Sequence, residues 1–293
     1  MSAGPDEQLW AEHGQLLERD GEIELPWVHQ AARWVLEDIA SQSPRHVLDV
    51  GAGPAVAACH LAELLPDTTV TALDSTPAFL ERARARADRL GLGDRVRAVR
   101  GDLDGELPII EPADLVWASH VVHHLRDPAA GLRRLRDLLS PTGLLVLAEG
   151  GLPMRVLPAG HGVGPPSLIL RFEAALSDHW IQTYGLHAGA VQGERDWPVL
   201  IAAAGFESVL TRTFLLDLPA PVPDEVRDHL HERFSELLPQ VRDRLDQSDL
   251  AALGRLVDAD DPASIRRRED LFLLAAFTVH VGRRTHASRP CRP

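Results

Sequence analysis

The sequence lacks lysine altogether and has only two cysteines, one tyrosine and no long apolar run. Cys59 and Cys291 are too few for a disulfide framework or a zinc ribbon. The longest apolar stretch, 271–279, has nine residues, far fewer than the roughly 20 that a membrane-spanning helix needs. The first residues also lack the basic and apolar regions of a signal peptide. We therefore expect a protein of the reducing cytoplasm that does not enter a membrane.

The charge of the chain is strongly acidic. All 30 basic residues are arginines, they face 43 acidic residues, and the formal net charge is −13. Such a field repels phosphate backbones and argues against a nucleic-acid partner. The most basic stretch, the arginines of 82–100, is preceded by Glu81 and interrupted by Asp88 and Asp94. That pattern is typical of a solvated helix face.

Residues 44–151 alternate between expected strands and helices. With 293 residues, 45 % hydrophobic and 25 % charged, the chain is expected to form one large domain with insertions, or a core with a small companion. The alternation predicts an α/β fold with a doubly wound parallel sheet and helices on both faces. The expected strands are 46–50, 69–73, 96–99, 114–118 and 144–149, and the expected helices are 55–65, 77–90 and 128–139.

The remaining parts of the chain do not show this alternation of strands and helices. A helix over 26–41 is predicted to open at Pro26, 153–166 is a loop rich in Pro and Gly, and Ser140-Pro141 is expected to end a helix. Two late strands would close the sheet edge. We expect a helical cap segment at 1–43, a core at 44–284 with cap insertions at about 153–195 and 218–264, and a tail at 285–293. The further expected elements are helices at 167–183, 196–204 and within 224–258, and strands at 206–216 and 271–282.

Ligands of open parallel sheets bind beyond the carboxyl ends of the strands. A glycine turn follows the first expected strand, and single acids follow the second and third. The turn GAGPAV lacks the third glycine of the dinucleotide pattern, and Pro54 removes a backbone donor that a pyrophosphate would use. Asp49, just before the turn, would repel a pyrophosphate and attract a cationic ligand. These features favour a ligand that carries an ammonium, a ribose and an adenine.

The stretches VLDVGAGPA, TALDST, GDL and ASHVVHHLRDP, followed by SPTGLLVLAEGG, resemble class I S-adenosylmethionine-dependent methyltransferases. The resemblance implies a seven-stranded, mostly parallel sheet and S-adenosyl-L-methionine as the cofactor. One departure is Ala55, where many members have a third glycine. The implied cofactor-binding residues are Asp49, Gly51 and Gly53 at the methionine part, Asp74 at the ribose, Asp102 and Leu103 at the adenine, with Ser75 and Ser119 included in the set.

Three residues are predicted as catalytic: His123, His120 and Glu149. A hydroxyl acceptor needs a base with a pKa near neutrality, which histidine supplies, whereas an amine or an activated carbon may not need one. Glu149 could instead cap a helix or form a salt bridge. His120 and His124 lie four residues apart and suggest a metal, but no third ligand stands at a compatible spacing, so no metal is predicted. His124 is expected to be a packed structural residue.

The sequence therefore predicts a methyltransferase that acts on a small, partly apolar molecule, in the manner of a natural-product O-methyltransferase. N- and C-methylation remain alternatives. Two other classes also remain: a nicotinamide-dependent oxidoreductase, and a non-catalytic partner subunit that keeps the fold. The expected partners are a small-molecule acceptor, no nucleic acid and no membrane, and the oligomeric state stays open, with a homodimer as one option.

Overall fold

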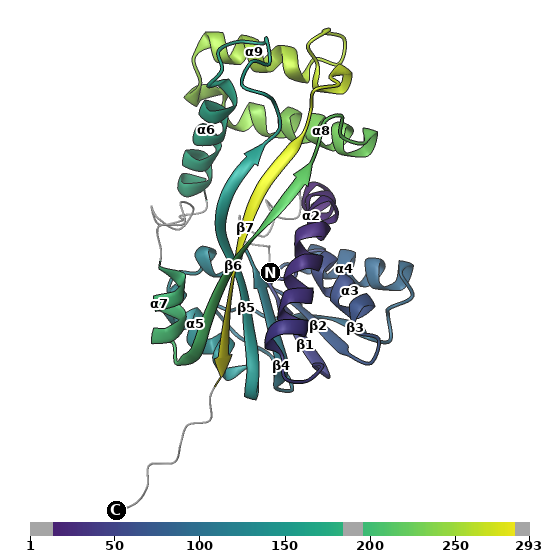
Figure 1. Ribbon diagram of the computed structural model, residues 1–293, viewed down its shortest axis with the longest axis vertical. Helices are drawn as coiled ribbons and strands as arrows, with labels where there is room; N and C mark the ends of the chain where they lie inside the picture. The colour runs from purple at the N-terminus through teal and green to yellow at the C-terminus, as the bar shows by residue number, and fades with distance from the viewer. Residues whose placement is uncertain (1–13, 184–195, 285–293) are drawn as a thin grey trace, which may run out of the picture. The chain divides into compact units, whose positions relative to one another are not determined.

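The computed structural model describes residues 14–183 and 196–284, which form two compact units (Figure 1). Within the described residues, unit 1 comprises 14–150, 196–214 and 278–284, and unit 2 comprises 151–183 and 215–277. No helix in these ranges is long and apolar enough to cross a membrane. The predicted tail at 285–293 lies outside the described residues.

Seven strands form one sheet in the order β3-β2-β1-β4-β5-β7-β6. The pairs β1–β2, β2–β3, β1–β4 and β4–β5 are all parallel, so the predicted fold class is confirmed. The strand order reverses between β1 and β4, which is the point where open α/β sheets bind ligands. The strands are β1 (His46–Val50), β2 (Thr69–Asp74), β3 (Val96–Arg100), β4 (Ala113–Ser119), β5 (Leu139–Arg155), β6 (Phe206–Leu218) and β7 (Leu273–Arg284).

Helices cover both faces of the sheet in unit 1 (Figure 1). On one face, Val116 and Ala118 of β4 pack in a core cluster with Leu132 and Leu135. On the other, Trp117 stacks on Trp27 of α2 with ring centroids 6.4 Å apart. Successive β4 side chains thus enter opposite layers, because side chains alternate along a strand. The helices of unit 1 are α2 (Gly14–Trp34), α3 (Val56–Leu64), α4 (Pro77–Arg89), α5 (Pro128–Asp137) and α7 (Trp197–Ala203).

Helix α2 runs through Pro26, so the prediction that a helix opens at this proline is wrong. Proline removes one backbone donor and normally bends or ends a helix. Here Trp27, Val28 and Ala31 follow it on a buried face. Tertiary packing of such a face contributes more to helix stability than local propensity does, which explains why the helix continues. A π-helix at Val35–Ile39 then ends it.

Strand β5 is longer than predicted at both ends. Ser140-Pro141, expected to end a helix, lies inside β5, and the strand continues beyond Glu149 to Arg155. The β4–β5 register shifts between the Ala113 and Leu115 pairs. This irregularity accommodates the proline, which cannot donate to a regular ladder.

Unit 2 is helical and has its own apolar contacts. Phe172 and Phe234 lie with ring centroids 5.1 Å apart, and the buried Asp249 accepts a 2.6 Å hydrogen bond from Nε of Arg171. The helix predicted at 167–183 is confirmed, and the helical region within 224–258 divides into two helices. The helices of unit 2 are α6 (Leu168–Thr183), α8 (Asp224–Val241) and α9 (Gln247–Val257).

Trp27 anchors α2 on unit 1, since it is 1 % exposed and stacks on Trp117. We expect Trp27→Ala to lower the free energy of unfolding by about 3–5 kcal/mol, the range for truncating a large buried aromatic residue. Ile109→Ala, at an exposed position, should change it by less than about 0.5 kcal/mol. Urea denaturation measures both, and equal effects for the two variants would contradict the packing role.

Candidate functional site

The glycine turn after β1 is closed on one side and open on the other. Gly51 and Gly53 both have positive φ, +65° and +53°, a region that glycine adopts without steric cost. A Cβ on Gly51 would overlap the Val121 side chain, whereas a Cβ on Gly53 would meet no described heavy atom within 4 Å. Ala55 continues the turn with φ of +60°. The backbone at Gly53 is therefore accessible to a ligand.

Asp74, at the end of β2, is tied to this turn. Its Oδ2 accepts a hydrogen bond from the Gly53 amide at 2.9 Å, and its Oδ1 accepts one from the Thr76 amide at 2.8 Å. Burial raises the pKa of Asp74, and these donors act in the opposite direction. Thr76 is a residue that the sequence analysis missed, although its place directly before Pro77 at a helix start is a recognisable signal. Ser75 lies between them and is exposed.

Asp49 is the most unusual group of the site. It is 3 % exposed, and its Oδ2 has no hydrogen-bond partner within the described part of the chain. Burial, with a further contribution from the charge of Asp74, raises the pKa of Asp49 from 3.8 to about 8. A buried carboxylate without a partner is costly, so this position is suited to a cationic group that would pair with it.

The other predicted cofactor residues lie in less constrained positions. Asp102 is exposed and its Oδ1 accepts a hydrogen bond from the Asp104 amide at 2.8 Å. The Leu103 side chain belongs to the core cluster, so only its backbone is available to a ligand. Ser119 is half-buried at the end of β4 and pairs with Ala148 of β5. The hydrogen bonds thus connect Gly53 and Asp74 directly, while the placement of the other three does not test their predicted role.

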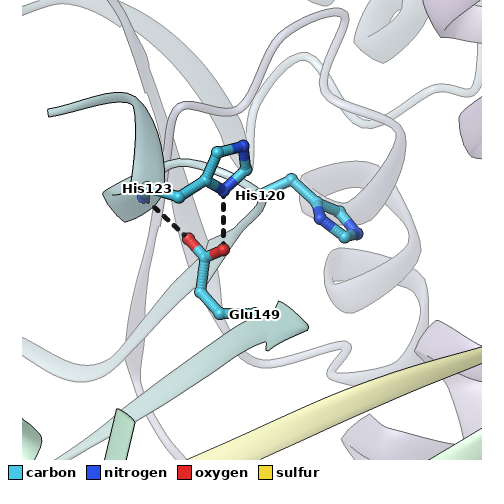
Figure 2. A group of neighbouring side chains, drawn as sticks. All are labelled: His120, His123 and Glu149. Carbon is cyan, nitrogen blue, oxygen red and sulfur yellow. Dashed lines mark hydrogen bonds and ion pairs between the residues drawn. The ribbon is translucent and has the colours of Figure 1, made fainter. Parts of the chain in front are cut away.

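Glu149 of β5 receives four hydrogen bonds. Its Oε1 accepts from the backbone amides of Val121, Val122 and His123 at 3.1, 2.8 and 3.3 Å. Its Oε2 lies 2.7 Å from Nδ1 of His123 (Figure 2). Burial alone would raise the pKa of this carboxyl, but the hydrogen bond from His123 and the neighbouring histidines hold the pKa below its usual value. Glu149 therefore orders the short helical turn Val122–His124 and contacts its histidine ring at the same time.

This arrangement selects one tautomer of His123. An ionised carboxylate only accepts hydrogen bonds, so Nδ1 of His123 must bear the proton that it donates to Glu149. In the neutral ring, Nε2 is then left as the acceptor. A histidine held in this way by a carboxylate is the arrangement of a general base.

The structure groups the histidines differently from the His120–His124 pair that the sequence spacing suggested. Strand β5 brings Glu149 next to His120 and His123, and ligand-type atoms of these three residues all lie within 4.8 Å of one another. Sequence spacing could not show this, since the strands meet only through sheet pairing. His124 is exposed instead of packed, because the turn directs its neighbours Val122 and Leu125 into the core.

Comparison with known proteins agrees with this geometry. Residues 48–145 match a family described as a methyltransferase domain. This match covers about a third of the chain, and the sheet order and the glycine turn lie in the same part of it. Residues 48–145 are therefore similar to a methyltransferase domain in sequence and in fold.

Relatives of this methyltransferase domain differ widely. The chain is 36 % identical over 113 residues to trans-aconitate 2-methyltransferase of Methylobacterium radiotolerans, a match that covers 39 % of this chain and 41 % of that protein. It is 31 % identical over 180 residues to the reducing polyketide synthase ppsB of Aspergillus oryzae, covering 59 % of this chain and 7 % of the synthase. The matches thus span less than half the length of either relative.

A solved structure shares the fold over most of the chain. A protein of Bacillus halodurans C-125, described as a candidate methyltransferase, superposes with a TM-score of 0.53 at 17 % identity. The match covers 88 % of this chain and 98 % of that one. At this identity the likeness establishes the fold alone.

The buried carboxyl of Asp49 binds its proton more tightly in the folded chain than in the unfolded one, because its pKa is raised from 3.8 to about 8. Its contribution to stability is therefore complete below about pH 4 and is lost as the pH rises to 8. We expect Asp49→Asn to raise the free energy of unfolding of the ligand-free protein at pH 8 by up to about 5 kcal/mol, since the pKa is raised by about four units and each unit corresponds to about 1.4 kcal/mol.

The stabilisation of Asp49→Asn should shrink towards pH 4, and denaturant unfolding at both pH values measures it. Asp102→Asn, at an exposed carboxyl, serves as the control and should change stability by less than about 0.5 kcal/mol. A destabilised Asp49→Asn variant at pH 8 would contradict the burial of an unpaired carboxylate.

Proposed function

We propose that this protein transfers a methyl group from S-adenosyl-L-methionine to a small molecule. The observation that carries the proposal is the buried, unpartnered Oδ2 of Asp49 beside an open glycine turn. A ligand with an ammonium group would supply the missing partner, and the open backbone at Gly53 leaves room for it. When bound, the cofactor supplies a methyl group activated by its attachment to a sulfonium.

Two carboxylates would hold opposite parts of this cofactor. Asp49 would pair with the ammonium, and Asp74, whose oxygens each accept one backbone hydrogen bond, has lone pairs left for ribose hydroxyls. Family resemblance assigns Asp102 and the backbone of Leu103 to the adenine, with Ser75 and Ser119 as further contacts. The acids, the glycine turn, the serines and the Leu103 backbone of this set can all contact the cofactor without a metal ion.

His123 is the base that we propose for the acceptor. Its Nε2 is the free acceptor nitrogen, and Glu149 stabilises the positive charge that the ring gains when it takes a proton. Such a base serves an acceptor atom that must lose a proton, and a hydroxyl oxygen is our first choice. An acidic carbon is the second choice, because it too must lose a proton. A neutral amine would not need this pair.

The acceptor is proposed to be a small, partly apolar molecule of the natural-product type. The net charge of −13 opposes nucleic acid. The relative trans-aconitate 2-methyltransferase is named for a small organic acid, which supports a small molecule as the acceptor.

Cofactor binding should depend on Asp74. We expect Asp74→Ala to weaken the binding of S-adenosylhomocysteine by roughly 1.5–3 kcal/mol, the scale of a hydrogen bond to a charged group. Asp67→Ala removes an exposed carboxyl that precedes the same strand and should bind as the unaltered protein does. Isothermal titration calorimetry measures both, and an unchanged dissociation constant for Asp74→Ala would remove the ribose assignment.

The class of acceptor is tested by a screen that uses methyl-labelled cofactor with a metabolite extract, a tRNA pool and a protein lysate. We expect label in small molecules, and label only in RNA or protein would refute the acceptor class.

Methyl transfer should depend on His123 and not on its neighbour His124. Once an acceptor is identified, His123→Ala should lower kcat by about 100-fold or more, the usual contribution of a general base. Glu149→Gln should also lower it, because its amide donates towards Nδ1 and so reverses the tautomer. His124→Ala, at an exposed ring 4.1 Å from that of His123, is the matched control and should retain activity. Full turnover of His123→Ala would end the base assignment while leaving the methyltransferase proposal intact.

A further inference from the structure

The cluster of His120, His123 and Glu149 has the composition of a metal-ligand set. Two imidazoles and one carboxylate are the protein ligands of many catalytic zinc sites, where a fourth position stays open. The three residues come from separate elements: the segment after β4, the turn Val122–His124 and strand β5. Ligand-type atoms of all three lie within 4.8 Å of one another (Figure 2).

The distances are close to those that a metal ion requires. Zinc–ligand bonds of about 2.0–2.2 Å put two neighbouring ligands of one ion roughly 3 Å apart. Nδ1 of His123 and Oε2 of Glu149 are 2.7 Å apart, so a small outward shift of both would admit the ion. The rings of His120 and His123 have centroids 6.3 Å apart at 77°. In Figure 2 the His120 ring lies to one side of the His123–Glu149 pair, so its side chain would have to rotate towards the ion.

The carboxylate is already ordered for such a role. Oε1 of Glu149 is held by three backbone amides, which leaves Oε2 directed at the histidines. Metal-ligating carboxylates are commonly fixed by hydrogen bonds of this kind. His120 has φ of +55°, a conformation that costs energy in a residue with a side chain and that clusters at functional sites.

We propose that His120, His123 and Glu149 bind a divalent transition-metal ion, with zinc the best match, and that the bound ion takes His123 out of its role as base. Ligation by Nδ1 removes the proton that this nitrogen donates to Glu149, and the ring then carries its proton on Nε2. The metal would therefore inhibit proton removal from the acceptor. Only this inhibition rests on the proposed function, because metal binding itself does not require that the protein be a methyltransferase.

Metal binding is tested on the untagged full chain without cofactor or acceptor. Cobalt is the spectroscopic probe, since its visible absorption reports tetrahedral ligation, and zinc binding is measured by calorimetry. We expect about one ion per chain, and His120→Ala should weaken binding by about 10-fold or more, at least the loss seen when a supporting residue of a metal site is removed.

Two controls separate this site from other histidines. His124→Ala keeps the three ligands and should bind as the unaltered protein does. His29→Ala removes a second histidine pair, in which Nδ1 of His29 lies 3.2 Å from Nε2 of His60, and should also leave the high-affinity ion in place. His120 is exposed, so its replacement by alanine should not unfold the chain, and a melting curve verifies this.

The outcomes are distinct. Binding lost in His120→Ala and His123→Ala but kept in both controls supports the site. Unchanged cobalt spectra in His120→Ala, or loss in His29→Ala instead, overturns it. For the regulatory half, the inhibition of each protein by zinc is expressed relative to its own rate without zinc. Half-inhibition of the unaltered protein should need at least about 10-fold less zinc than half-inhibition of His120→Ala, and equal concentrations would refute it. A chain that binds zinc but transfers no methyl group would refute the proposed function and leave the metal site standing.

Discussion

Three carboxyl groups are buried, two at the carboxyl ends of strands β1 and β2 and one, Glu149, within β5. The way in which each of them is compensated organises the whole site. Asp74 accepts backbone amides of the glycine turn and of the start of α4. Glu149 accepts three amides and a histidine ring. Asp49 retains an oxygen without a partner. Because an uncompensated buried charge is expensive, the first two carboxylates stabilise their loops, and the third is left to be compensated by a ligand.

The sheet places the segments that hold these carboxyl groups next to one another. The order β3-β2-β1-β4-β5 puts the glycine turn after β1 beside the loop after β4, where the strand order reverses. Val121, next to the histidine turn, closes the space over Gly51. The glycine turn and the histidine turn are therefore in packing contact, and Glu149 holds the segment that makes this contact. A change in that segment would affect both turns at once.

At His123, one hydrogen-bond partner limits which ring nitrogen can accept a proton. The carboxylate of Glu149 sets the tautomer of the neutral ring and leaves Nε2 as its hydrogen-bond acceptor. The same carboxylate, with His120 near it, also forms a set of donor atoms for a metal. A metal ion on Nδ1 would leave the ring proton on Nε2, the nitrogen that would otherwise be free to accept one.

Much of the fold followed from local patterns. The strand 46–50 was predicted with the bounds that the structure has, and the helices after β1, β2 and β4 began and ended close to their predicted residues, because glycine, proline and apolar runs act over a few residues. Asp49, Gly51, Gly53 and Asp74 could be singled out because each stands directly beyond or at the end of a strand. The predictions that a helix opens at Pro26 and that Pro141 lies outside a strand were wrong, because packing and an irregular strand register outweighed the local effect of each proline.

The sequence by itself determined the parallel sheet and the acids and glycines at its carboxyl end, since these depend on the periodicity and punctuation of short segments. Only the tertiary structure decided which side chains are partners. That Glu149 pairs with His123, that His120 joins them while His124 does not, and that Asp49 keeps an unpaired oxygen all depend on sheet pairing and burial. Those contacts join residues far apart in the chain, and no spacing along the sequence specifies them.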